Sequence, residues 1–313
     1  MIGLITRRFF QLILLLFGIS FLVFMSMHIA PGDPATIIGG PNATSSDLEA
    51  IREEMGLNRP VLIQYFDYLG GILQGDFGYS YQTNQAVTEA IITRFPTTVK
   101  LATASMIVAV IIGIVAGIIS ARKQNSWIDV TSTTFALVGV SIPNFWLGAM
   151  LILVFAVNLQ VLPVGGLNSP FYTLEGLKEL ILPAITLGTA SAALIARMTR
   201  SSMLEVVRSD YIRTAKAKGV RNRPLIWVHA LKNAMIPVIT IIGINFGTLL
   251  GGTIITEQVF AINGIGRLMI DAIAARDFPI VQGTVLLVAA IFVIVNLIVD
   301  IIYALIDPRI SYD

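Results

Sequence analysis

Few side chains in this 313-residue sequence could do chemistry, and six of its 21 Lys and Arg residues lie in one stretch at 209–237. The sequence has no cysteine and only two histidines, His28 and His229, which excludes thiolate chemistry and makes a histidine metal cluster improbable. It also lacks a GxxxxGK[ST] phosphate loop, an HExxH motif and a GxSxG nucleophile motif. We therefore expect no enzyme activity, no bound cofactor and no metal site. The polar stretch that remains is SDYIRTAKAKGVRNRPLIWVHALKNAMIP at 209–237.

This cationic stretch carries the signals of two short helices joined by a sharp turn. Ser209 or Asp210 can cap the first helix, and Gly219 suits the left-handed position at which a helix ends. Pro224 fits the first turn of a second helix, which we expect to continue until Pro237. The pattern predicts a helix, a sharp turn and a helix between two apolar segments.

Two explanations compete for the composition of this stretch. Positive charge alone would orient the chain in a membrane, and this explains the cations. It does not explain the small residues Ala215, Ala217 and Gly219 at the turn. A short helix with a small-residue surface is suited to enter a groove of a partner protein.

The elements around this stretch are those of a membrane protein. The chain is 55% hydrophobic and only 13% charged, whereas soluble domains carry about 25% charged residues. A membrane-spanning helix needs roughly 17–25 mostly apolar residues. The uncharged segments predict an all-α protein with six spans, near 9–30, 98–121, 131–157, 180–200, 236–257 and 281–305.

The predicted spans contain almost no ionisable groups. Glu257 lies near the outer end of the fifth span, and Asp300 lies near the inner end of the last. Ion-coupled carriers usually place such groups in mid-membrane. The sequence therefore disfavours an ion-driven mechanism, and energy for transport would have to come from a partner.

The Lys and Arg residues predict the orientation of the chain. Arg7 and Arg8 precede the first span, which we interpret as a retained helix rather than a cleaved signal, and nine more cations lie between Arg197 and Lys232. The segment 31–97 holds eight acids and three basic residues. Because cytoplasmic loops carry the excess of Lys and Arg, we expect both termini in the cytoplasm.

The chain divides into three parts on this interpretation: 1–30 with the first span, an extracytoplasmic segment at 31–97, and a core at 98–313 that contains a cytoplasmic loop at 201–235. In the extracytoplasmic segment, SSDLEAIREEMGLNRP predicts a short helix at about 46–55 with a Ser cap. VLIQYFDYLGGIL predicts a second, amphipathic helix, and QGDFGYSYQTNQ a loop. This segment has too little apolar surface for its own core and is expected to cap the bundle.

RTAKAKG at 213–219 resembles the cytoplasmic "EAA" loop of binding-protein-dependent ABC transporter permeases. Arg213 and Thr214 stand where that motif has a glutamate and an alanine, whereas Ala215 and Gly219 match it. The departure puts any salt bridge from that glutamate in doubt. YIRTAKAKG followed by HALKNAMIP is similar to the dipeptide, oligopeptide and nickel branch of the family.

The resemblance extends along nearly the whole chain. In order, the matching segments are HIAPGDPA, GLNRPVLIQYFDYL, GDFGYS, SIPNFWLG, LPAITLG, RMTRSSMLEV, GGTIITEQVF, GIGRLMIDAI, RDFPIVQG and NLIVDIIYALIDPRI. It implies the first of two permease subunits in a bacterial cytoplasmic membrane, with two ATPase subunits that bind ATP and Mg²⁺ and an extracytoplasmic solute-binding protein. The expected substrate is a short peptide, with nickel or a nickel chelate as the alternative.

The resemblance also implies roles for individual residues. The residues expected to couple the chain to the ATPases are Asp210, Tyr211, Arg213, Thr214, Ala215 and Gly219. Asn245, Thr248 and Glu257 are candidates for the translocation path, with helix packing, or for Glu257 a structural hydrogen bond, as the alternative.

Two other classes of protein stay open at this point. One is a self-contained channel or ion-coupled carrier. The other is a scaffold protein whose basic loop binds anionic lipid or nucleic acid; we expect contact with membrane lipid but no nucleic-acid partner.

Overall fold

The computed structural model describes the chain except residues 1, 30–32, 41, 222–229 and 307–313, and its described part is almost entirely helical. The elements before the core are α1 (Ile2–Ile29), α2 (Pro34–Gly39), α3 (Ser45–Glu54), α4 (Val61–Leu73), β1 (Tyr79–Ser80) and β2 (Gln85–Ala86). The core continues with α5 (Val87–Arg122), α6 (Trp127–Ser141), α7 (Asn144–Leu151), the π-helical segment η1 (Ile152–Asn158) and α8 (Leu174–Val207). The last elements are α9 (Asp210–Ala217), α11 (Leu231–Gly252), α12 (Ile254–Val259), α13 (Ile265–Ala275) and α14 (Phe278–Ile306).

Five described helices are long and apolar enough to cross a membrane, and a bent pair makes up to six. The five are Phe10–Ile29, Val87–Arg122, Leu174–Val207, Leu231–Gly251 and Phe278–Val299. Each coincides with a predicted span, although α5 and α8 extend well beyond the predicted ends. The fifth predicted span, 236–257, is interrupted, because α11 ends at Gly252 and α12 starts after Thr253.

The third predicted span, 131–157, is wrong as a single helix. It consists of α6 and α7 with η1, which meet at an angle of 102°. The break falls at Ile142, whose backbone is extended because the ring of the following proline disfavours a helical conformation there. Pro143 then begins the next helix. A charge-free run of the right length therefore did not reveal that the backbone changes direction.

Helices α5 and α8 form the central pair of the bundle, and glycines allow their close approach. A Cβ at Gly113 would lie 2.8 Å from the carbonyl oxygen of Ala192, and a Cβ at Gly117 would lie 2.5 Å from the Cβ of Thr199. Small residues let membrane helices pack backbone to backbone. The GIVAG segment at 113–117 is therefore a packing surface of α5 against α8.

The segment between the first two spans forms a small helical unit beside α1. Helix α3 begins one residue before the predicted start, and its cap is Thr44, which exchanges hydrogen bonds with Asp47, rather than a serine. Helix α4 packs on α1 through Tyr65, which is 2% exposed and whose hydroxyl bonds Ser20. The predicted loop contains the two-residue strands β1 and β2, paired antiparallel.

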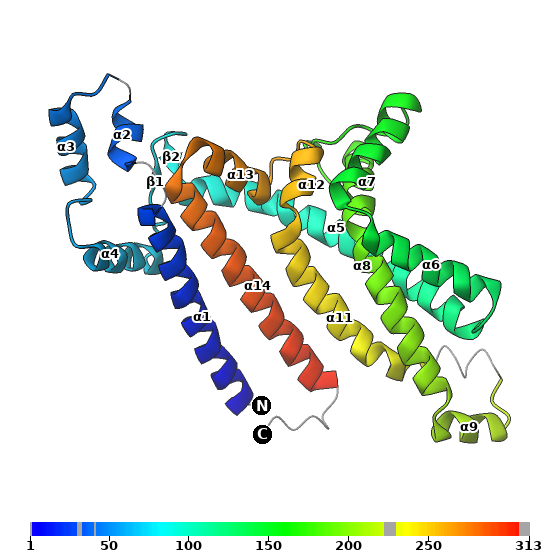
Figure 1. Cartoon of the computed structure of the whole chain (residues 1–313). Helices are drawn as coiled ribbons and strands as arrows, with labels where there is room; N and C mark the ends of the chain where they lie inside the picture. Colours follow the sequence, from blue (N-terminus) through cyan, green and yellow to red (C-terminus); the bar gives the residue numbers. More distant parts are fainter. Residues whose placement is uncertain (1, 30–32, 41, 222–229, 307–313) are drawn as a thin grey trace.

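Figure 1 shows how the elements divide between the two ends of the bundle. Helix α9 lies at one end, together with the start of α1 and the end of α14. The small elements α2, α3, β1, β2, α12 and α13 lie at the other. We call the end that carries α9 the α9 end, and the end that carries these small elements the elaborate end.

Candidate functional site

Helix α9 is the first of the two short helices predicted between the fourth and fifth spans. The backbone N–H of Arg213 donates to the carbonyl of Ser209 over 3.2 Å at its start. After its last turn the chain reverses at Gly219, whose φ of +84° lies in the left-handed region. The predicted left-handed turn is confirmed. The start of the second predicted helix, at Pro224, lies outside the described residues. Its predicted end at Pro237 is wrong, because α11 runs without a break from Leu231 through Pro237.

One face of α9 packs on the chain's own helices. Ile212 is 3% exposed and lies in a cluster with Met203 of α8 and with Ala230 and Ala234 at the start of α11. Ala215 is half-buried against the same cluster. The helical period turns Ala215 partly inward with Ile212, and its contact with a partner stays a prediction. The cluster attaches α9 to both α8 and α11.

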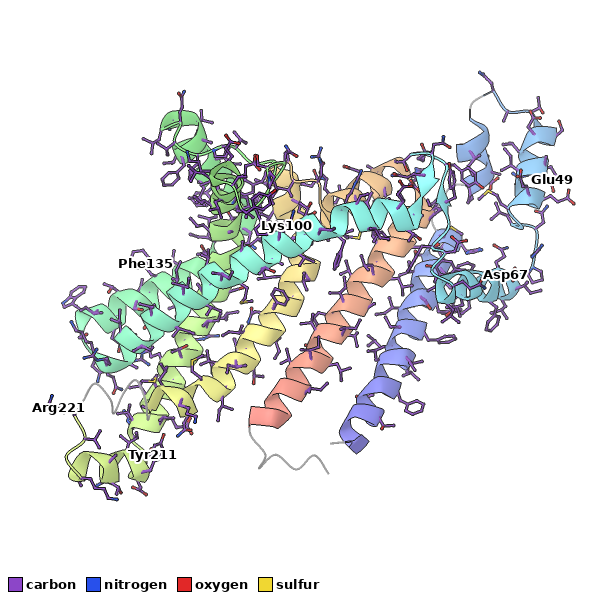
Figure 2. All side chains as sticks on the ribbon, turned by 180° about the vertical axis from the view of Figure 1, so that it is seen from behind. Glu49, Asp67, Lys100, Phe135, Tyr211 and Arg221 are labelled. Carbon is purple, nitrogen blue, oxygen red and sulfur yellow. The ribbon has the colours of Figure 1, made fainter. Side chains whose placement is uncertain are left out.

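The opposite face of α9 is open. Its exposed predicted residues are Asp210, Tyr211, Arg213 and Thr214, followed by Gly219. The Tyr211 hydroxyl accepts a hydrogen bond of 2.8 Å from the side-chain amide of Asn233, and Figure 2 shows Tyr211 at the α9 end of the molecule. The Arg213–Asp210 ion pair, at 3.6 Å between exposed side chains, adds little stability. This open face is the part of the predicted site that a partner can reach.

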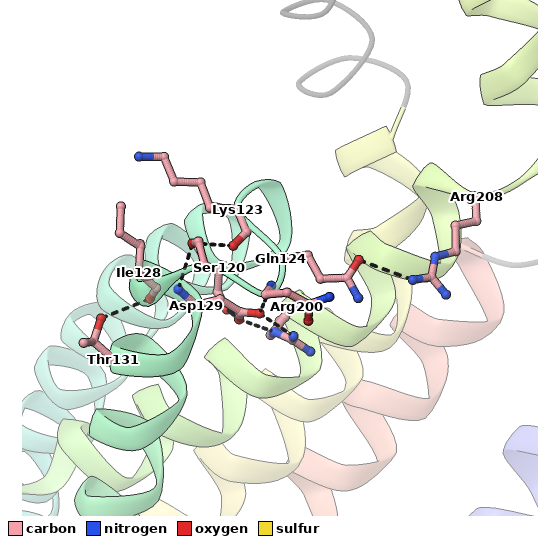
Figure 3. Close-up of polar contacts among 10 residues, drawn as sticks. Ser120, Lys123, Gln124, Ile128, Asp129, Thr131, Arg200 and Arg208 are labelled. Atoms are coloured by element: carbon pink, nitrogen blue, oxygen red, sulfur yellow. Dashed lines mark hydrogen bonds and ion pairs between the residues drawn. The ribbon is translucent and has the colours of Figure 1, made fainter.

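A buried ion pair close to α9 was missed by the sequence analysis. Asp129 in the first turn of α6 is 4% exposed and accepts two hydrogen bonds of 2.7 Å from Nε and Nη2 of Arg200 on α8 (Figure 3). The Ser120 hydroxyl of α5 also donates to this carboxylate, and the backbone N–H of Asn125 donates over 2.9 Å. Three helices are therefore held together by one carboxylate.

The sequence around Asp129 held a signal for this arrangement. Ser126 caps α6 and Asp129 follows three residues later, which is the spacing of a helix start with an acid near the positive end of the helix dipole. A second contact joins the same elements, because Arg208 at the end of α8 donates to the side chain of Gln124 over 3.3 Å (Figure 3). Only the fold brings Arg200 to this point, 71 residues along the chain.

The ion pair and the α9 cluster meet on α5. Ser120 donates to Asp129, and the next residue, Ala121, packs against the cluster around Ile212. The ends of α5, α6, α8 and α11 are thus joined with α9 through one continuous set of contacts.

Two of the three predicted path residues lie on α11. Asn245 is half-buried and donates to the carbonyl of Ile241 over 2.9 Å, whereas Thr248 is exposed and donates to the carbonyl of Ile244 over 3.0 Å. Residues three apart share a helix face. Both polar side chains bond their own helix, which satisfies them in an apolar surrounding, and their contact with a solute stays a prediction.

Glu257, the third predicted path residue, lies on α12 in a buried hydrogen-bond network. It is completely buried, and its carboxylate accepts hydrogen bonds from Thr98 at 2.7 Å, Thr253 at 2.9 Å and the backbone N–H of Arg267 at 3.0 Å. The Thr98 hydroxyl in turn accepts a hydrogen bond from the backbone N–H of Ile265. In this conformation the carboxylate is inaccessible and joins α5, α12 and α13, which fits the alternative of a structural hydrogen bond, and its contact with a solute stays a prediction.

The fold and these contacts define a helical membrane protein, a bundle with a short amphipathic helix attached to two spans at one end. The chain belongs to the family of binding-protein-dependent transport system inner membrane components, which matches residues 113–312. Residues 1–102 match the N-terminal part of such membrane components. The chain is therefore a multi-pass inner membrane protein and a permease component rather than an enzyme.

Similar proteins match over the whole length. The dipeptide transport system permease protein DppB of Alkalihalophilus pseudofirmus is 46% identical over 98% of each chain. The glutathione transport system permease protein GsiC of Escherichia coli K12 is 44% identical over 100% of each chain.

A solved structure shares the fold. A chain of the MetNI methionine ABC transporter, in inward-facing conformations, aligns with a TM-score of 0.56 at 19% identity. The alignment covers 96% of that chain but 69% of this one. At this identity the likeness concerns the arrangement of helices alone.

Proposed function

We propose that this chain is one of two permease subunits of an ATP-driven importer of short peptides. The observation that carries the proposal is the full-length similarity, at 44–46% identity, to permeases named for dipeptide and glutathione transport. Glutathione is itself a tripeptide, so both named solutes share a small size, an α-amino group and a carboxylate. The class of solute is therefore a short zwitterionic peptide.

The proposed complex contains a second permease subunit, two ATPase subunits that bind ATP and Mg²⁺, and a solute-binding protein. The end of the bundle that carries α9 faces the cytoplasm and the ATPases, and the elaborate end faces the binding protein. The concentration of Lys and Arg between Arg197 and Lys232 supports this orientation. The start of α1 and the end of α14 lie on the same side as α9, as cytoplasmic termini require (Figure 1).

We infer how the ATPase subunits are coupled to the membrane helices from the contacts that hold α9. The open face with Tyr211, Arg213 and Thr214 contacts the ATPase, while Ile212 holds the helix to α8 and α11. Movement of the ATPase pair thereby displaces α11, which carries Asn245 and Thr248, and α8. The Asp129–Arg200 pair extends the same movement to α6 and α5. Rigid-body displacement of packed helices is a common way to open and close a path.

Two measurements test the proposal. Deletion of the gene should abolish growth on di- to pentapeptides and leave nickel accumulation normal; a nickel defect with normal peptide use would assign the alternative substrate. Liposomes that contain the assembled complex should take up labelled dialanine only with ATP and the binding protein. Uptake by the single chain without ATP would refute the importer assignment.

A further inference from the structure

A cavity of about 300 Å³ lies between α6 and α8, at the level of the third and fourth predicted spans. Its wall is largely apolar, with Ala136, Leu137 and Val140 from α6 and Ala193 and Leu194 from α8. Leu137 and Val140 are also exposed, so the cavity can be entered from outside the bundle. The cavity is therefore an open, mostly apolar site at membrane depth.

The Asp129–Arg200 pair joins α6 and α8 on the α9 side of this cavity (Figure 3). The two helices run in opposite directions, since α8 leads toward α9 and α6 leads away from the α9 end (Figure 1). Ser132 follows Asp129 by three residues and Arg197 precedes Arg200 by three, so each lies about one turn further from the α9 end. Ser132 and Arg197 therefore line the cavity from opposite sides at the same level.

The polar groups of the cavity wall differ in whether the protein engages them. Arg197 is exposed and makes no hydrogen bond or ion pair within the described part of the chain, whereas Arg200 is held in the ion pair. The hydroxyls of Ser132 and Thr133 also bond no described residue, although a hydroxyl in a span can bond its own helix, as that of Thr186 does. Ionisable groups at membrane depth normally have a partner. The cavity thus offers one cation and two hydroxyls to a ligand.

The size and charge of the cavity select the ligand. A helix is about 10–12 Å across with its side chains, so a cavity of about 300 Å³ holds no further span, whereas an acyl chain fits. A guanidinium and two hydroxyls are donors that match the oxygens of a phosphate. The orientation proposed above places this level in the cytoplasmic leaflet, which carries anionic lipids, and basic pockets between spans on that side bind anionic head groups.

We propose that the cavity between α6 and α8 binds one anionic phospholipid of the cytoplasmic leaflet, with its phosphate on Arg197, Ser132 and Thr133. One acyl chain lies along Leu137 and Val140 and fills the space beside the buried ion pair. The site depends on the proposed orientation of the chain but not on the transported solute.

The test uses the transporter assembled with its second permease and ATPase subunits and stripped of lipid in detergent. Native mass spectrometry measures the phosphatidylglycerol retained by the transporter as lipid is added back, with phosphatidylcholine as the comparison lipid. We expect saturable retention of phosphatidylglycerol, about fivefold tighter than that of phosphatidylcholine, because only the former brings a net negative charge to Arg197.

Arg197→Gln should weaken this binding about tenfold, as loss of one hydrogen bond between charged groups does. Arg197→Lys keeps a cation in place and should retain most of the affinity. Arg122→Gln is the matched control, because Arg122 at the end of α5 is exposed near the same end of the bundle but does not line the cavity. An unchanged affinity in Arg197→Gln, or an equal loss in Arg122→Gln, would overturn the proposal.

A second pair of variants tests the place of the acyl chain. Ala136→Phe fills the cavity and leaves Arg197 in place, so it should abolish retention of phosphatidylglycerol, whereas Val138→Phe, exposed on the same helix outside the cavity, should not. Retention that persists in Ala136→Phe, or equal affinity for the two lipids, would refute the site. Retention by the separate chain that is lost on assembly would also refute it and assign the cavity to the second permease subunit. Retention is measured without solute, and single-cysteine labelling tests the orientation separately, so failure of the proposed function is distinguished from failure of the lipid site.

Discussion

Arg200 of α8 holds Asp129 of α6 through two hydrogen bonds of 2.7 Å, in the paired geometry that a guanidinium and a carboxylate make best. The carboxylate is buried, and Arg200 is 30% exposed. The pair fixes the start of α6 against α8 one helix turn or more before α8 reaches α9. We consider it the element that lets α6 follow the movement of α8.

Removal of either partner of the Asp129–Arg200 pair should therefore lower the free energy of unfolding. Asp129→Asn leaves the guanidinium without its charge partner, and we expect a loss of roughly 3 kcal/mol in the free energy of unfolding. Arg200→Lys should lower the free energy of unfolding by a similar amount, since an ammonium cannot make both hydrogen bonds. Thermal unfolding in detergent measures the loss. Arg197→Lys, on the same helix with no described ion pair, is the control and should change little; an equal effect there would refute a specific role for the pair.

Sequence patterns predicted the elements whose physical cause is local. Runs without charge located the spans, because hydrocarbon excludes charged side chains wherever they fall in the chain. The end of α9 was equally predictable, since only Gly219 in its stretch adopts a left-handed turn without strain. The start of α3 was located to within one residue by the same local logic, although its cap is Thr44 and not the predicted serine.

Features that depend on contacts between residues far apart in the sequence were not predicted. Nothing local distinguishes Asp129 from an acid that merely caps a helix until α8 brings Arg200 beside it. The resemblance gave Glu257 two alternative roles, on the path or in a structural hydrogen bond, and only the fold places Thr98 against its carboxylate. The inward orientation of Ala215 likewise depends on the cluster of α8 and α11 residues that receives it.

The residues packed against Glu257 should not tolerate a larger side chain. A Cβ at Gly264 would lie 2.4 Å from the carboxylate, so Gly264→Ala must displace Glu257 and should cost about 1–3 kcal/mol of unfolding free energy. Glu257→Gln should cost a similar amount, because its amide N–H₂ group meets hydrogen-bond donors. Both variants are measured by thermal unfolding. If Glu257→Gln were fully stable but lost transport, a direct role in the path would replace the structural one.

The close packing of α5 on α8 leads us to a second prediction about side-chain size. Gly117→Ala places a methyl group 2.6 Å from the carbonyl oxygen of Ala196 and should destabilise the chain by about 1–3 kcal/mol. Gly247→Ala on α11 is the control, since its nearest contact would be an ordinary 3.4 Å from Val295. Expression and unfolding of the two variants give the comparison. Equal tolerance would show that the two helices separate easily.

Single cysteines test the orientation, because the chain has none of its own. Cysteines in place of the exposed Thr83 and Asn168 should react with an impermeant maleimide on intact cells. A cysteine in place of Lys123, in the exposed turn between α5 and α6, should react only after permeabilisation. Reaction of the Lys123 position from outside would reverse the proposed topology.

The two faces of α9 should separate docking from transmission. Thr214→Trp adds bulk to the open face and should weaken association with the ATPase subunits, measured by co-purification, while the free permease folds normally. Ile212→Ala removes the buried anchor at a cost of about 2–5 kcal/mol of local packing.

The anchor variant should still bind the ATPases, because its open face is intact. ATP hydrolysis should persist while peptide uptake falls, since α9 no longer displaces α8 and α11 together. Arg221→Ala, an exposed cation beyond the Gly219 turn, should leave both activities near wild type. The docking interpretation fails if Thr214→Trp retains full association and uptake while Arg221→Ala abolishes them, and transmission through Ile212 fails if Ile212→Ala keeps uptake tightly coupled to hydrolysis.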